Sequence, residues 1–228
     1  MVRLSRALLL ALSLSLVCAP VALAATYDVT TDRAVDVPDR TVQQGGDAFE
    51  ITAISRADPG ETVSVTVTAP SGEDVRLYLY NDREAIVTAP EGTGSARFEG
   101  TLNGYDAGSY AFVLQHDDVR EAVHPLVVRG YEVGVDAPGS TTRGESLRVT
   151  ASAEKLRGPD LESVEVVVAN DDASVRTTAN ATGSGYAATV DTADLPAGSY
   201  EVYANVRGPD RAFGERELLG LTAGGSLT

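Results

Sequence analysis

The chain has only two histidines, and both lie near carboxylates in the sequence. His116 is followed by Asp117 and Asp118, and His124 stands just before Pro125. A metal site or a hydrolytic centre would need these side chains to converge on one point. If Asp117-Asp118 is the tip of a hairpin, the two imidazoles fall several residues apart along the ladder. We therefore interpret the cluster as a polar hairpin tip and a strand histidine, and predict neither a catalytic residue nor a metal site.

Outside this cluster, the sequence also lacks the motifs that catalysis or cofactor binding needs. The sequence has no Gly-x-Ser-x-Gly nucleophile motif and no glycine-rich phosphate loop. We therefore expect a protein that is not an enzyme and binds no cofactor. The carboxylate pairs Asp117-Asp118 and Asp171-Asp172 have the oxygen atoms that calcium prefers, but not the spacing of a calcium loop. Weak divalent-cation binding and ordinary turn use both stay open at these pairs.

Tyr78 and Tyr80 are a candidate binding surface. They lie two residues apart in an alternating run and so share one face of a strand, opposite Val75 and Leu77. An exposed tyrosine pair can stack on a sugar or dock a protein. The alternative is that a neighbouring sheet edge or residues 25–48 cover the pair.

The chain contains one N-glycosylation sequon, Asn180-Ala181-Thr182. It lies in the turn-rich stretch 178–185, where an exported protein would expose it. Asn180 is therefore a candidate glycosylation site. A second short motif, Arg157-Gly158-Pro159-Asp160, recurs at residues 207–210. Because proline and glycine in this order favour a turn, we expect two loops of similar shape.

The first 24 residues have the features of a cleaved signal peptide. Arg3 and Arg6 precede the apolar run 8–17, and the small-x-small sequence Ala22-Leu23-Ala24 follows. Cys18 is the only cysteine, so the mature chain has no disulfide. No later apolar stretch reaches the roughly 20 residues of a membrane span. We expect a secreted protein or one at the extracellular cell surface.

The charge balance excludes one class of partner. The chain has 33 Asp and Glu against 18 Lys and Arg, and losing Arg3 and Arg6 changes the formal net charge from −15 to −17. Nucleic acid is therefore not an expected partner. Lys155 is the only lysine. This composition fits both a GC-rich genome and a halophile, whose acidic surface stays hydrated in concentrated salt.

A short motif repeats and organises the whole chain. Residues 106–110, Asp-Ala-Gly-Ser-Tyr, return as Pro-Ala-Gly-Ser-Tyr at 196–200, each before an alternating run. Upstream strand-like runs recur in the same order: residues 60–67 with 144–151, 75–80 with 164–169, and 96–102 with 185–191. We therefore predict two tandem copies of one fold.

The predicted boundaries follow from this repeat. Domain 1 spans 25–129, with a leading strand or arm at 25–48 that has no counterpart in the second copy. Domain 2 spans 130–222, and 223–228 is a tail. Arg129-Gly130 is too short for a flexible linker, so we expect two domains end to end as a semi-rigid rod.

Asp-x-Gly-x-Tyr before a buried strand resembles the tyrosine corner of immunoglobulin-like domains. The resemblance implies that Tyr110, with Asp106 and Gly108, bonds back to the upstream backbone. Tyr200 keeps Gly198 but has proline in place of the aspartate, so we expect a second corner of different construction.

The two copies together resemble prokaryotic immunoglobulin-like surface modules. The stretch Val37-Pro38-Asp39-Arg40-Thr41-Val42, running on to residues 58–62, is similar to haloarchaeal cell-surface glycoproteins. This implies an all-β fold, two tandem immunoglobulin-like antiparallel β-sandwich domains after a signal peptide. It also implies a non-catalytic structural or interaction role with other cell-surface proteins or glycans as partners. A carbohydrate-binding or adhesive protein with a specific ligand on one sandwich is the alternative.

Overall fold

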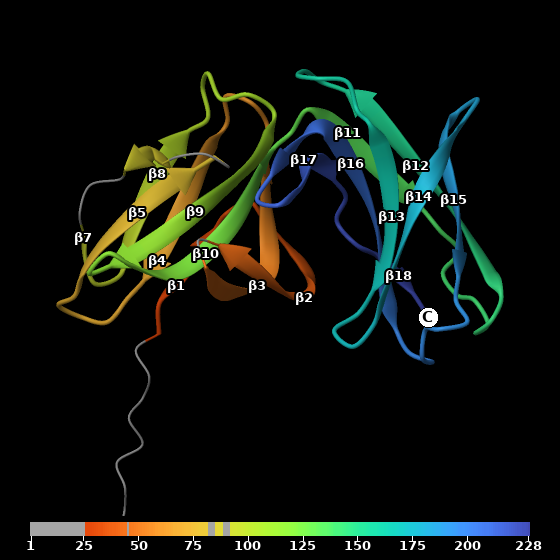
Figure 1. Cartoon of the computed structure of the whole chain (residues 1–228), viewed down its shortest axis with the longest axis horizontal. Helices are drawn as coiled ribbons and strands as arrows, with labels where there is room; N and C mark the ends of the chain where they lie inside the picture. Colours follow the sequence, from red (N-terminus) through yellow and green to blue (C-terminus); the bar gives the residue numbers. More distant parts are fainter. Residues whose placement is uncertain (1–25, 45, 82–84, 89–91) are drawn as a thin grey trace, which may run out of the picture.

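The computed structural model describes residues 26–44, 46–81, 85–88 and 92–228. The signal peptide predicted at residues 1–24 lies outside them. All regular structure in the described residues is β-strand, which confirms the all-β prediction. The strands form two groups that lie side by side, one before residue 129 and one after it (Figure 1).

The first group is a sandwich-like pair of sheets. A small sheet has the order β1-β4-β8, and a large one has the order β2-β3-β10-β9-β5-β6, with β7 paired to β5. The pairs are antiparallel except β10 with β3, which run parallel. Its strands are β1 (Asp28–Thr31), β2 (Ala34–Gln44), β3 (Asp47–Ala57), β4 (Thr62–Thr68), β5 (Asp74–Tyr80), β6 (Ala85–Thr88), β7 (Gly92–Thr93), β8 (Ala96–Thr101), β9 (Gly108–His116) and β10 (Val119–Val128).

The second group is one continuous sheet that curls on itself. Its order is β11-β12-β15-β14-β13-β16-β17, with β18 paired to β16, and β11 returns to lie against β16 and β17. Its strands are β11 (Tyr131–Asp136), β12 (Ser146–Lys155), β13 (Ser163–Ala169), β14 (Ser174–Thr182), β15 (Gly185–Asp191), β16 (Tyr200–Ala212), β17 (Glu215–Leu221) and β18 (Gly225–Leu227).

The repeated motifs occupy the same places in the two groups. β4 pairs with β8 as β12 pairs with β15, β5 pairs with β9 as β13 pairs with β16, and β9 pairs with β10 as β16 pairs with β17. The groups differ in how their two faces are joined. β14 joins β13 to β15 and makes the second group continuous, whereas the first group keeps its two sheets apart.

Alternating side chains build a separate apolar core in each group. In β5, Val75, Leu77 and Leu79 are buried, and Arg76 between them is exposed. A strand with this period of two places one face against the core and one toward solvent. The second core contains, among others, Val149, Val166, Val168, Val202 and Val206.

Residues 28–44 contain two strands, one in each sheet of the first group. β1 pairs with β4 in the small sheet, and β2 pairs antiparallel with β3 at the edge of the large one. The register of β2 breaks between Asp36 and Arg40, where Pro38 has no N–H to donate. The same stretch therefore contributes one strand to each sheet.

The two groups are not an end-to-end rod, so that expectation was wrong. A third apolar cluster joins Ile51, Ile54 and Val127 of the first group to Leu218 and Leu221 of the second. A register shift where β17 pairs with β16 lets Leu219 enter the second core while Leu218 and Leu221 face the first group. Because β17 is apolar on both faces, burying it requires the groups to pack side by side.

Candidate functional site

Both repeated tyrosines make the same bond. The Tyr110 hydroxyl donates to the Asp106 carbonyl at 3.0 Å, and the Tyr200 hydroxyl donates to the Pro196 carbonyl at 2.8 Å. The expectation that the second corner is built differently was therefore wrong. The acceptor is a backbone carbonyl, which proline supplies as well as aspartate. Gly198 lies in the same turn, with the Tyr200 ring 3.9 Å from where its β-carbon would be.

The first corner also forms the junction between the two groups. Ala107, one residue after Asp106, is buried in the core of the second group. It lies against two glycines of that group. A β-carbon added at Gly130 or at Gly158 would stand 2.9 Å from the Ala107 methyl group. The junction therefore has no room for a further methyl group.

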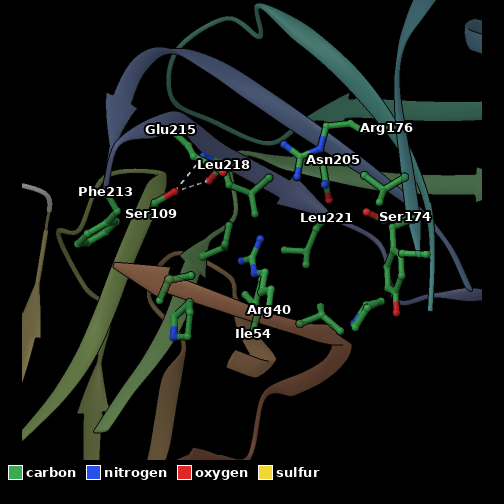
Figure 2. A pocket seen from close by; sticks show the side chains of 18 of the residues that line it. Arg40, Ile54, Ser109, Ser174, Arg176, Asn205, Phe213, Glu215, Leu218 and Leu221 are labelled. Carbon is green, nitrogen blue, oxygen red and sulfur yellow. Dashed lines mark hydrogen bonds between the residues drawn. The ribbon is translucent and has the colours of Figure 1, made fainter. Parts of the chain in front are cut away.

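Polar groups hold the junction on either side of Ala107. The Ser109 hydroxyl accepts a bond from the Leu218 amide at 2.8 Å (Figure 2). The Glu217 carboxylate accepts a bond from the Ser109 amide at 3.4 Å and fills the space beside Gly108. The Gly130 amide donates to the Leu219 carbonyl at 2.8 Å. The corner residues found in the sequence thus link the two groups as well as closing their own loop.

A groove of about 710 Å³ lies between the two groups beside this junction. This is the size of a small-molecule site. One wall comes from β2, β3 and β10, and the other from β13, β14, β16 and β17. Its apolar floor includes Ile54, Val127, Leu218 and Leu221 of the shared cluster. Figure 2 shows Arg40 and Ile54 on one side of this space and Asn205, Arg176 and Ser174 on the other.

The second group lines the groove with a network of charges. Arg207 is 5% exposed, and its Nε lies 2.8 Å from Glu165 Oε2. Its other nitrogens reach the Arg216 carbonyl at 3.0 Å and the Glu215 carboxylate at 3.4 Å. Arg176 shares the Glu165 carboxylate at 3.8 Å. Each nitrogen of the Arg207 guanidinium therefore has a protein partner.

Arg40 enters the groove from β2 and has a different environment. It makes no hydrogen bond and no ion pair with another residue in the part of the chain that the structure describes. Arg40 is exposed to solvent within the groove. Partial desolvation by the neighbouring protein lowers the pKa of Arg40, opposed by the charge of Glu215 and assisted by the charges of Arg207 and Arg176.

Tyr203 borders the same groove. Its hydroxyl donates to the Glu201 carboxylate, and the residue is only 4% exposed. Burial, together with this carboxylate, raises the pKa of Tyr203 well above its ordinary value. The phenol therefore stays protonated and acts as a fixed donor.

Tyr78 and Tyr80 are both half-buried on the outer face of β5. Their ring centroids are 5.9 Å apart and the rings are tilted by 54°. Tyr78 pairs with Val113 and Tyr80 with Ala111 on the neighbouring β9. The two rings therefore contact each other rather than forming one flat platform.

The two histidines have separate structural roles. His124 is 6% exposed, and its Nε2 lies 2.7 Å from the Ser55 hydroxyl. Burial lowers the pKa of His124. His116 lies at the end of β9, where its bond to the Asp74 carbonyl raises its pKa. Four residues of strand separate their register positions, a distance of about 13 Å.

The carboxylate pairs lie in turns. Asp117 and Asp118 both take positive φ at the β9–β10 turn. The amide of Asp172 donates to the Asn170 side chain, which closes the turn around Asp171. The described residues contain no group of three or more His, Cys, Asp or Glu side chains that could hold a metal ion.

Two motifs lie in strands rather than in the predicted turns. Asn180 is exposed, but it belongs to β14 and pairs with Ala187. Residues 207–210 lie inside β16, whereas residues 157–160 form a loop in which Gly158 has a φ of 83°. The expectation of two similar loops was therefore wrong, because the second motif sits at a break in the β16–β17 ladder.

No protein-family model matches the chain, and no curated protein matches it. Among the residues that the structure covers, no helix is long and apolar enough to cross a membrane.

Proposed function

We propose that this protein is a non-catalytic structural and interaction module at the extracellular cell surface or in the medium. We further propose that it consists of two tandem immunoglobulin-like sandwiches released from a signal peptide. The junction is the observation that carries this proposal. Ala107 is buried in the second core, and Leu218 and Leu221 pack on the first group. An interface this closely packed holds two binding faces in one orientation, as a scaffold or adhesive protein requires.

The acidic composition supports the same role. A formal charge of −15 keeps a protein soluble and discourages binding to nucleic acid. Recognition would then use polar loops, sheet faces or the groove, with other surface proteins or glycans as partners. Turn carboxylates such as Asp171 and Asp172 are the proposed source of any weak divalent-cation binding.

Cell fractionation of the native protein, with and without a divalent-cation chelator, tests this proposal. We expect the mature chain to begin near Ala25, to sediment with the envelope and to be released by the chelator. Intact mass would reveal a glycan at Asn180. A protein that is found inside the cell with residues 1–24 attached would refute the proposal.

A carbohydrate-binding role is the second candidate. The favouring observation is that Tyr78 and Tyr80 both keep part of their rings accessible on the outer face of β5. A glycan array followed by Tyr78→Ala and Tyr80→Ala tests it. Loss of glycan binding in either variant supports this role, and unchanged binding would place the contact elsewhere.

A further inference from the structure

One of the cations that line the groove, Arg40, makes no hydrogen bond or ion pair within the described part of the chain. Four arginines and four carboxylates line the groove, so its formal charge is zero in a chain of net charge −15. Arg207 is held by Glu165 and Glu215, and Arg216 lies 2.7 Å from Glu162. Only Arg40 and Arg176 direct charge toward the open space, and Arg176 already has Glu165 at 3.8 Å.

Arg40 is the residue on which the argument depends. Its guanidinium carries donors in a planar fork that matches a carboxylate. In the described part of the chain no hydrogen bond or ion pair uses these donors. Because Arg40 is exposed in the groove, an incoming anion can reach these donors.

The rest of the groove restricts what kind of anion fits. The lining near Arg40 is aliphatic, with Ile54 on its own side of the groove and Leu218 and Leu221 toward the second group. The opposite wall has Asn205 and Ser174, which offer neutral hydrogen-bonding groups. A ligand that satisfies both surfaces has one anionic group attached to an apolar body.

The remaining charges exclude a polyanion. The exposed carboxylates Asp39, Asp171 and Asp172 also line the groove, and they would repel a second or third negative charge. One unpaired guanidinium compensates one carboxylate. The site is therefore matched to a monoanion.

We propose that the groove between the two groups binds a monocarboxylate with an apolar body, whose carboxylate pairs with Arg40 and whose body lies on Ile54, Leu218 and Leu221. This ligand chemistry occurs in free aliphatic acids and at the carboxyl terminus of a peptide with an apolar last residue. The proposal goes beyond the surface role proposed above, because it holds wherever the protein resides.

Calorimetric titration of the mature chain with hexanoate tests the proposal, with hexanamide and glutarate as matched probes. We expect saturable binding of hexanoate and binding of hexanamide and glutarate that is at least about tenfold weaker. Titration with N-acetylleucine distinguishes the two sources, since tighter binding than hexanoate indicates a peptide terminus. Equal binding of hexanoate and hexanamide, or no binding of any probe, would overturn the proposal.

Arginine variants locate the site. Arg40→Gln should weaken hexanoate binding at least about tenfold, whereas Arg143→Gln removes the same charge from an exposed loop and should leave it unchanged. Arg40→Lys keeps the charge but loses the fork, so it should give an intermediate affinity. Thermal unfolding of each variant checks that it is folded. Equal affinity in Arg40→Gln and Arg143→Gln would overturn the assignment, while the cell-surface proposal would still rest on fractionation.

Discussion

The Gly130→Ala substitution should test how closely the junction is packed, because it adds a single methyl group there. Gly130 is buried, and its φ does not lie in the region that favours glycine, so alanine fits the backbone. The new methyl group would stand 2.9 Å from the Ala107 methyl and 3.0 Å from the Arg157 carbonyl oxygen. Both contacts are shorter than van der Waals distances allow, so one group must move.

The magnitude follows from two opposing effects. Overpacking of a closely packed interior typically costs about 1–3 kcal/mol. Replacing glycine by alanine also restricts the unfolded chain, which stabilises the folded state by about 0.4–1 kcal/mol. Packing should prevail, because the carbonyl of Arg157 belongs to the backbone and cannot rotate away. We expect a net loss of about 1–2 kcal/mol, or a fall in Tm of about 2–8 °C for a chain of this length.

Gly139→Ala is the matched control. Its added methyl group would meet nothing within 4 Å, and its φ is also compatible with alanine. It should therefore show only the small stabilisation from the unfolded state. Thermal unfolding of the three mature proteins, followed by circular dichroism, measures the difference. If Gly130→Ala unfolds at or above the temperature of Gly139→Ala, the account of a closely packed junction is wrong.

Three further outcomes follow from single side chains. Because burial lowers the pKa of His124 in the folded state, a falling pH protonates His124 in the unfolded state before it does so in the folded state. The stability from this residue is present above about pH 6.5 and is lost as the pH falls through the lower folded pKa. Urea unfolding at pH 7.5 and 5.5 should show a lower free energy of unfolding at pH 5.5, and the difference between the two pH values should be smaller in His124→Gln. The raised pKa of His116 acts in the opposite direction, because its contribution to stability is larger at low pH. Tyr200→Phe should cost about 1 kcal/mol in the same assay through its lost corner bond, and an unchanged midpoint would contradict that role. Arg207→Met should cost about 3 kcal/mol, because Glu165 then keeps only the more distant Arg176, and adding Glu165→Gln should recover part of that loss.

Strand positions were readable from the sequence because alternation is a local property. Residues 75–80 alternate apolar and polar side chains, and they form β5 with the apolar set buried. The hydrogen bond of the Tyr110 hydroxyl was also predictable, since its acceptor lies only four residues upstream. The bond at the second corner was not predicted, because its acceptor is a backbone carbonyl, and the residue type at position 196 does not affect that group.

The groove was not predicted from the sequence, although one sequence feature indicates that the two groups of strands pack together. Residues 218–221, Leu-Leu-Gly-Leu, are apolar at neighbouring positions, unlike the alternating strands elsewhere. A strand that is apolar on both faces is buried on both sides. Arg40 gave no signal, because the charged side chains near it, Arg176, Arg207 and Glu215, lie more than 130 residues away in the sequence.

The sequence by itself determined many of the strands, the repeat and the first tyrosine corner. These features depend on contacts between residues close in the chain, or on a period of two along one strand. Only the tertiary structure decided that Ala107 enters the second core and that Arg40 lies near the charges of β14, β16 and β17. Both results depend on how two packed bodies are oriented, and a register shift of one residue in β17 sets that orientation. No local pattern specifies such a shift, because its consequence lies in the other half of the chain.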